Sequence, residues 1–100
     1  MENVVIGKYC IVRGDRSGVF AGTVTAQNGR EVVFENVRRL WRWYGATDCF
    51  QLSKEGVRDV KDNNRITVEV SQMAILDAIE IIPCTPEAEK SIREMGEWKF

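Results

Sequence analysis

The sequence contains no histidine, which is the commonest general base and the commonest metal ligand in proteins. Most hydrolytic triads are therefore excluded. The three cysteines, Cys10, Cys49 and Cys84, lie far apart without CxxC or CxH spacing, and the carboxylates form no DxD group. The glycines follow neither GxGxxG nor GxxxxGK. We therefore predict no catalytic residue, no metal and no cofactor, although a carboxylate pair assembled by the fold stays open.

An excess of charge of either sign is also missing. The formal net charge is -1 and the pI is near 5.5, so the chain lacks the broad positive field that coats nucleic acid, and we do not expect a nucleic-acid partner. The charge is nevertheless uneven, because the last quarter is acidic and the middle is basic. Positive residues of the middle are Arg30, Arg38, Arg39, Arg42, Lys54, Arg58, Lys61 and Arg65. A local basic patch is compatible with this pattern.

Long apolar runs are absent as well. No stretch approaches the roughly 20 apolar residues of a membrane span, and residues 1–7 do not have the pattern of a signal peptide. An odd number of dispersed cysteines is typical of reduced thiols in a cytosolic protein. With 100 residues, 44% of them hydrophobic, we expect one domain over residues 1–100, located in the cytoplasm, with no membrane contact.

The first third of the chain has the pattern of antiparallel strands. Dense apolar residues predict a strand over Val4–Val12, which ends at a turn over Gly14–Gly18. Val19–Ala26 and Arg30–Phe34 are predicted as the next two strands. Asn28-Gly29 between them favours a two-residue hairpin turn with positive φ at both central residues.

The segment Asn36–Tyr44, NVRRLWRWY, fits two structures. As a helix it would be capped by Asn36 and would gather its apolar residues on one face. As a strand it benefits from Val, Trp and Tyr, which pack well on a pleated surface. We favour the strand, with a kink at Glu35-Asn36. Arg38 and Arg42 share a face in either case, because four residues fit both periods.

A short helix is predicted over Thr47–Glu55. Thr47 is its expected N-cap and Gly56 its terminator. Phe50 and Leu52 are expected to anchor it.

The last third of the chain predicts two strands and a second helix. After a polar loop over Lys61–Asn64, Ile66–Val70 alternates as a half-buried strand does, and Ile75–Ile82 is a further strand, closed by Pro83. Thr85-Pro86 has the signature of a helix start. The expected apolar stripe of that helix is Ala88, Ile92 and Met95. The fold class is therefore α+β, with a small antiparallel sheet or partly open barrel and two short helices, one of them C-terminal.

Arginines alternate with large aromatic residues in the middle of the chain. Guanidinium groups grip phosphate oxygens and aromatic rings stack on bases, so the cluster is a candidate site for an anionic aromatic ligand. Two alternatives stay open: tryptophans in the core with arginines on a solvated face, or a protein interface, since Trp, Tyr and Arg are enriched in hot spots. The candidate ligand-binding residues are Arg38, Arg39, Trp41, Arg42, Trp43 and Tyr44.

Four blocks of the sequence resemble a family of small phage and prophage proteins classed as a domain of unknown function. They are VFAGTV (19–24), NGREVVFENVRRLWRWYGA (28–46), QLSKEGV (51–57) and IEIIPCT (79–85). The resemblance covers most of the chain from Val19 onward. It implies a phage or prophage origin and a setting in the host cytoplasm, and it brings no catalytic residues.

By analogy with small phage proteins that antagonise host defence, we expect a binding protein without enzymatic activity. The first hypothesis is a sponge that sequesters a nucleotide-derived host immune signal, and the alternative is an inhibitor of a host defence protein. A nucleic-acid-binding accessory role is the weakest option. A homo-oligomer is also expected, since Val4–Val12 and Ile75–Ile82 offer more apolar strand surface than two short helices readily cover.

Overall fold

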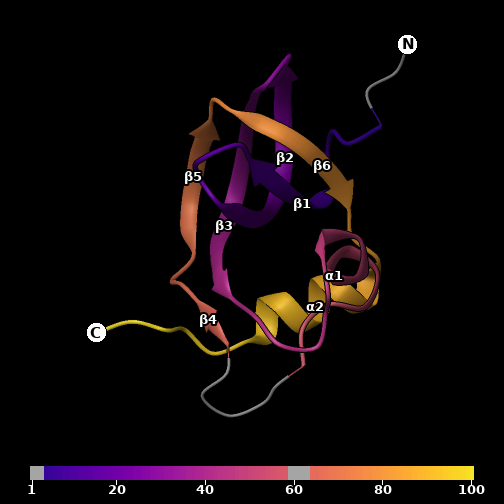
Figure 1. The fold of residues 1–100 in the computed structure, drawn as a ribbon. Helices are drawn as coiled ribbons and strands as arrows, with labels where there is room; N and C mark the ends of the chain where they lie inside the picture. Colours follow the sequence, from indigo (N-terminus) through magenta and orange to yellow (C-terminus); the bar gives the residue numbers. More distant parts are fainter. Residues whose placement is uncertain (1–3, 59–63) are drawn as a thin grey trace.

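The computed structural model describes residues 4–58 and 64–100, which form a six-stranded antiparallel sheet and two helices (Figure 1). The α+β class is confirmed, and the sheet is curled but not closed. No helix in these ranges is long and apolar enough to cross a membrane. In chain order the elements are β1 (Tyr9–Gly14), β2 (Val19–Asn28), β3 (Glu31–Arg42), α1 (Cys49–Glu55), β4 (Arg65–Ile66), β5 (Val70–Ile75), β6 (Ala78–Pro83) and α2 (Pro86–Glu94).

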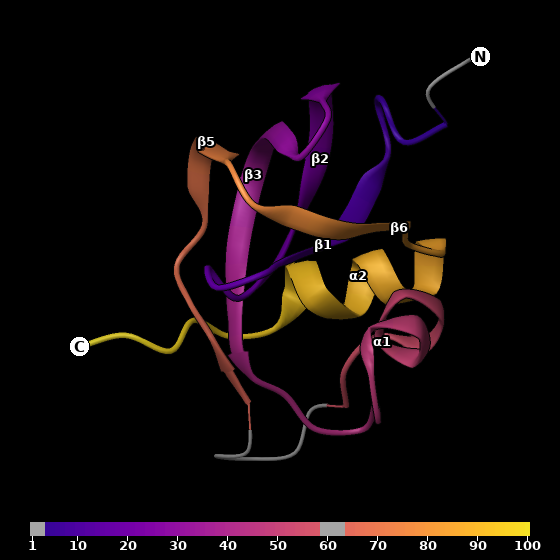
Figure 2. The ribbon, with the colours of Figure 1, turned by 45° about the horizontal axis from the view of Figure 1, so that its top comes forward.

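The long strand β3 organises the sheet. The strand order is β4-β3-β2-β1-β6, and β5 also pairs with β3. Val37 of β3 faces Val70 of β5, whereas Leu40 faces Ile66 of β4, so two short strands follow one another along a single edge of β3. Both views show the ribbon curving around an interior, with β5 and β6 joined at one corner (Figures 1 and 2).

The two faces of the sheet carry separate hydrophobic clusters. Alternation in β1 sends Cys10 and Val12 to the inner cluster, where they meet Phe20 and Phe34. Ile11 points to the other face, which α1 and α2 cover (Figure 2). The outer cluster consists of Tyr9, Ile11, Ala21, Leu40, Cys49, Leu52, Val57, Ile66 and Ile92.

A bulge bends β3 at the predicted kink. Ala21 pairs with Arg38 but Thr23 pairs with Glu35, so β3 contains one residue more than β2 between these pairs. Asn36 has a φ of 54°, which Asn tolerates better than most residues. On β2, a Cβ at Gly22 would lie 3.0 Å from the carbonyl oxygen of Glu35. The strand interpretation of NVRRLWRWY is therefore confirmed as far as Arg42, where β3 ends before Trp43 and Tyr44, and the predicted kink is confirmed.

The hairpin between β2 and β3 is confirmed, but its turn lies one residue later than predicted. Asn28 pairs with Glu31, so the loop residues are Gly29 and Arg30. Gly29 has a φ of 61°, and neither Asn28 nor Arg30 has a positive φ. The expectation of positive φ at both central residues was wrong, since a glycine at the first loop position meets the conformational requirement by itself.

The predicted strands differ from the observed strands in their bounds. The second ends at Asn28 and not at Ala26, and the third runs from Glu31 to Arg42 and not from Arg30 to Phe34. The first strand begins at Tyr9, because residues 4–7 form a turn in which the amide of Gly7 donates to the carbonyl of Val24. The predicted strand over 66–70 is divided between β4 and β5, and Val68 and Val70 are substantially exposed. Its alternation is therefore not that of one half-buried strand. The predicted loop over 61–64 lies outside the described residues except for Asn64.

The predicted strand over 75–82 is interrupted at Leu76 and Asp77. The Asp77 carboxylate accepts from the amides of Arg16 and Ser17 and from the Ser17 hydroxyl, so it holds the β1–β2 turn. These bonds hold the pKa of Asp77 below its ordinary value. The chain bends at Asp77 because the aspartate side chain is hydrogen-bonded to the β1–β2 turn. The strand β6 then begins at Ala78.

Both predicted helices are present, with one cap reassigned. Asp48, not Thr47, caps α1, because its carboxylate accepts from the amide of Gln51. Leu52 is buried as expected, but Phe50 is 65% exposed and does not anchor the helix. Gly56 ends α1 with a φ of 77°.

The C-terminal helix α2 follows its prediction closely. Thr85 caps it by accepting from the amide of Ala88, and its hydroxyl donates to the carbonyl of Lys54 at the end of α1. Ala88 and Ile92 are fully buried, and Met95 packs at the edge of the outer cluster. The cap therefore also joins the two helices.

Candidate functional site

Arg38 lies buried between the sheet and the end of α2. Its backbone pairs with Ala21 of β2, and its side chain points toward the helix-covered face, where only 3% of the residue is exposed. The guanidinium donates to backbone carbonyl oxygens only. The acceptors are Thr67 (2.9 Å), Ile92 (2.7 Å), Met95 (2.6 Å), Ile66 (3.2 Å) and Gly96 (3.3 Å).

These bonds occupy Arg38 fully. A guanidinium has five N–H donors, and the five carbonyls account for them. Desolvation by burial lowers the pKa of Arg38, while the charges of Tyr9, Glu97 and Glu69 oppose that effect. The carbonyls of Ile92 and Met95 belong to the C-terminal end of α2, where the helix dipole favours a cation. Arg38 therefore acts as a clamp between β3, β4 and α2 and has no free donor for a ligand.

Arg39, the next residue, lies on the opposite face and is exposed. Its guanidinium carbon lies 5.0 Å from the centroid of the Phe20 ring, within the range of a cation–π contact. Its amide donates to the Thr67 hydroxyl at 3.1 Å, and its carbonyl accepts from the Thr67 amide at 3.0 Å. The backbone of Arg39 is thus held while its charged end reaches solvent.

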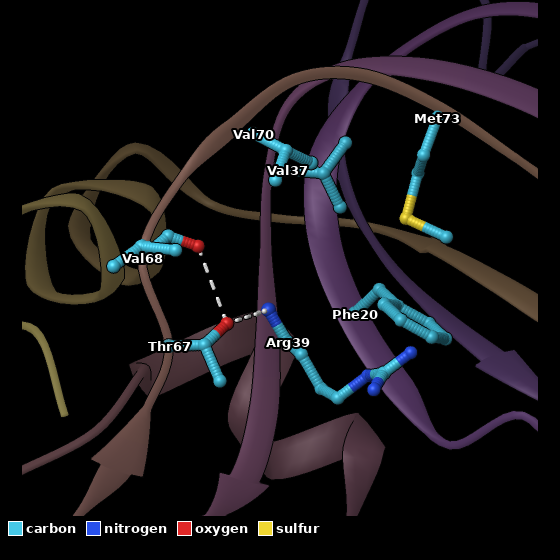
Figure 3. A pocket seen from close by; sticks show the side chains of 7 residues that line it. All are labelled: Phe20, Val37, Arg39, Thr67, Val68, Val70 and Met73. Atoms are coloured by element: carbon cyan, nitrogen blue, oxygen red, sulfur yellow. Dashed lines mark hydrogen bonds between the residues drawn. The ribbon is translucent and has the colours of Figure 1, made fainter. Parts of the chain in front are cut away.

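Arg39 borders a hollow of about 300 Å³ where the inner cluster opens to solvent (Figure 3). The hollow lies where the edge of β3 changes partner from β5 to β4. Its lining is largely aliphatic, and Arg39 is the one charged side chain among the described residues that line it. The lining residues are Phe20, Val37, Arg39, Thr67, Val68, Val70 and Met73.

Trp41 belongs to a ladder of planar side chains with Trp98 and Arg65, and Trp98 shares a smaller hollow with Thr67. The Trp41 ring stacks on that of Trp98, with centroids 6.4 Å apart and an interplanar angle of 25°. The guanidinium of Arg65 lies 5.0 Å from the Trp98 ring centroid. The Trp98 amide donates to the carbonyl of Ile66 at 2.8 Å, which holds the C-terminal segment along β4. Trp41 is 66% exposed and Trp98 is 44% exposed.

The other three predicted site residues lie elsewhere. Arg42 is exposed at the end of β3. Trp43 packs against the outer cluster, and its indole N–H donates to the carbonyl of Ala46 at 3.2 Å. Tyr44 is half exposed, and its amide donates to the side chain of Asn64. The structure therefore does not gather the six predicted residues into one pocket.

Three arginines of β3 and β4 lack an acidic partner among the described residues. Arg39, Arg42 and Arg65 form no ion pair there. Elsewhere Arg13 pairs with Glu80 at 2.8 Å and Arg93 with Glu89 at 2.8 Å. The strands β3 and β4 thus carry positive charge that no carboxylate of the described residues compensates.

We call this region the aromatic–basic surface. Arg39 and Trp41 are among the residues that the sequence predicts as ligand-binding, whereas the three residues from the C-terminal half are not. Trp98 and Arg65 are of the same residue types as the cluster at 38–44, and this was the one feature that could have drawn attention to them. Nothing in the sequence places Thr67 beside them. The surface consists of Arg39, Trp41, Arg65, Thr67 and Trp98.

The described residues include metal-ligating and nucleophilic side chains. They contain no group of three or more His, Cys, Asp or Glu side chains placed to hold a metal. Desolvation raises the pKa of Cys10 to about 11 and that of Cys84 to about 12, so neither thiol is activated as a nucleophile. Desolvation also raises the pKa of Tyr9.

Comparison with known proteins gives a family but no activity. No curated protein matches the chain, and no solved structure does. A family model described as "Domain of unknown function (DUF6948)" matches residues 7–92, which is most of the chain. The chain therefore belongs to the DUF6948 family.

Proposed function

We propose that this protein is a non-catalytic binding domain that attaches to another protein through the aromatic–basic surface. The carrying observation is the ladder of Trp41, Trp98 and Arg65, in which two indole rings remain substantially exposed. In the phage setting suggested by the sequence blocks, the partner is a host defence protein in the cytoplasm.

The composition of the surface supports a protein partner. Trp and Arg are the residues most enriched at interface hot spots, because they combine a large apolar area with directional donors. The stack and the cation–π contact hold the Trp98 ring before a partner arrives, which reduces the entropy lost on binding. An exposed, ordered apolar surface lowers solubility, so its presence on a folded protein is typical of an interaction site.

A nucleotide sponge is the second candidate function, and the hollow beside Arg39 is the observation that favours it. Its volume of about 300 Å³ is at the lower end of the range of ligand pockets. Its lining has one guanidinium, however, and Arg38 has no free donor. A nucleotide site would therefore need positive charge from a second copy of the chain, in the homo-oligomer that the sequence predicts.

Site-specific crosslinking tests the first proposal. A photoreactive residue is placed at position 41 and, as a control, at Lys90, which is exposed on α2. After irradiation in bacterial cells we expect one host protein to crosslink from position 41 and not from position 90. That protein, once purified, is expected to bind the wild type and to lose at least about tenfold in affinity with Trp41→Ala. No crosslink from position 41, or equal affinity for Trp41→Ala, would contradict the proposal.

Incubation with a panel of cyclic nucleotides and cyclic ADP-ribose isomers, followed by heat denaturation, tests the second candidate. Intact ligand released only from the wild type, and not from Arg39→Ala, would favour the sponge. Chemically altered ligand would indicate an enzyme and would overturn both candidates.

A further inference from the structure

Three strands, β4, β5 and β6, lie at the edges of the described sheet, and they differ in how they are protected. The two-residue strand β4 pairs with β3 alone, but the C-terminal segment covers it, since the Trp98 amide donates to the carbonyl of Ile66. Among the described residues, β5 pairs with β3 alone and β6 pairs with β1 alone, so each has one free edge. The sequence of β6, AIEIIP, contains Glu80 and Pro83, and both kinds of residue discourage pairing with another strand. The sequence of β5, VSQMAI, contains neither a charge nor a proline. Only β5 is therefore an open template for a further strand.

The unprotected edge adjoins the hollow. Val70 and Met73 of β5 line one side, and Phe20 with Arg39 line the other (Figure 3). In an added strand, alternate side chains would point to the same inner face as Met73. An apolar side chain from such a strand would meet Val70 and Met73 in the hollow.

The charge beside the hollow restricts the partner further. The Arg39 guanidinium has no carboxylate within ion-pair distance among the described residues, and neither has Arg65 on β4. A carboxylate next to the inserted apolar side chain would gain a charge-assisted hydrogen bond from Arg39. An arginine or lysine at that position would be repelled.

We propose that the partner pairs an extended segment with the free edge of β5, with an apolar side chain in the hollow and a neighbouring Asp or Glu on Arg39. This inference rests on the proposed function, of which it names the partner chemistry. Strand addition supplies affinity through the backbone, and the hollow with Arg39 supplies specificity.

Selection from a displayed library of random short peptides tests the specificity. With the wild type we expect enrichment of peptides in which Asp or Glu adjoins a Leu, Met or Phe. With Arg39→Glu the preference is expected to change to Lys or Arg, and with the control Lys90→Glu it is expected to stay acidic. Denaturation midpoints of the variants show that each is folded. An unchanged acidic preference in Arg39→Glu would overturn the inference, as would enrichment without any apolar residue.

Hydrogen exchange tests the strand addition. When an enriched peptide is added, amides of β5 that face solvent are expected to gain protection, while those of β6 are unchanged. Arg39→Ala is expected to lower the affinity for the peptide by about tenfold. Protection of β5 amides that rises with protein concentration without peptide would identify a second copy of the chain as the occupant and overturn the inference. Displacement of the peptide by a single-stranded oligonucleotide would overturn it in favour of nucleic acid.

The outcomes separate this inference from the proposed function. A crosslinked partner that is lost with Trp41→Ala but leaves β5 amides unprotected would retain the proposed function and reject strand addition. If no protein crosslinks from position 41 but a peptide protects the β5 amides, strand addition would be retained and the proposed function would be rejected.

Discussion

Arg38 and Arg39 are neighbours in one strand, yet they lie in opposite environments. The Arg38 side chain is enclosed between sheet and helix and bonded to five carbonyls. The Arg39 side chain lies over Phe20 at the opening of the inner cluster, without an ionic partner among the described residues. An arginine side chain therefore stabilises the fold on the face that the helices cover, and it is free to bind a partner on the face that opens to solvent. The position of a guanidinium relative to the pleat decides its role, and its place in a cluster of arginines does not.

The largest expected effect is that of Arg38→Ala. The substitution leaves five carbonyls without their donor in a site closed to solvent, and we expect a loss of about 3 kcal/mol or more in the free energy of unfolding. Urea denaturation followed by tryptophan fluorescence measures it. Arg38→Lys is expected to restore only part of the loss, because an ammonium has three donors and no planar fork. A loss below about 0.5 kcal/mol would show that Arg38 is not a clamp.

Gly22→Ala is expected to disturb the bulge that precedes the two arginines. The added Cβ would lie 3.0 Å from the Glu35 carbonyl oxygen and 3.0 Å from Phe34 and Val37 side-chain atoms. We expect a loss of about 1–3 kcal/mol from overpacking. The control is Gly29→Ala, whose Cβ would meet nothing within 4 Å but whose φ is 61°. It is expected to lose about 1 kcal/mol from the backbone alone, so equal losses would contradict a steric role for Gly22.

Alkaline pH tests how well the inner cluster excludes water away from the hollow. The pKa of Cys10 rises from its ordinary value of 9.0 to about 11 because burial disfavours the thiolate. Its contribution to stability is complete below pH 9, since the thiol is then neutral in both states, and it is lost as pH rises toward 11. Denaturation midpoints should fall across that window, and less steeply in Cys10→Ala. Equal slopes would mean that water reaches Cys10.

Arg39→Ala is expected to change stability least. The cation–π contact with Phe20 contributes about 0.5–1 kcal/mol at an exposed site, and the Arg39 side chain has no hydrogen bond to the described residues that the substitution would remove. Denaturation of Arg39→Ala beside Arg38→Ala therefore measures the contrast between the two faces directly. A loss as large as that of Arg38→Ala would remove the distinction.

Local signals in the sequence predicted much of the fold. The cap at Thr85, the terminator Gly56 and the kink at Asn36 depend on conformations and hydrogen bonds within a few residues, and each is present. The strand bounds failed where distant residues intervene. The best example is Asp77, which bends the chain because it bonds to a turn 60 residues earlier.

The candidate site was predicted in part. The density of Arg and Trp around β3 identified Arg39 and Trp41, but period 2 alone does not say which face the helices cover. The alternation therefore could not show that Arg38 is buried and that Arg39 is exposed. The contribution of Trp98 depends on the path of the chain after α2, where its amide bonds to Ile66. No local pattern specifies that path.

The clamp at Arg38 also affects the order of events during synthesis. Three of its acceptors, the carbonyls of Ile92, Met95 and Gly96, follow it by 54 to 58 residues in the chain. While β1, β2 and β3 are outside the ribosome and α2 is still inside it, a sheet that closed over Arg38 would bury a guanidinium with too few acceptors. We therefore expect the nascent hairpin to stay hydrated around Arg38 until residues 92–96 arrive and the outer face docks.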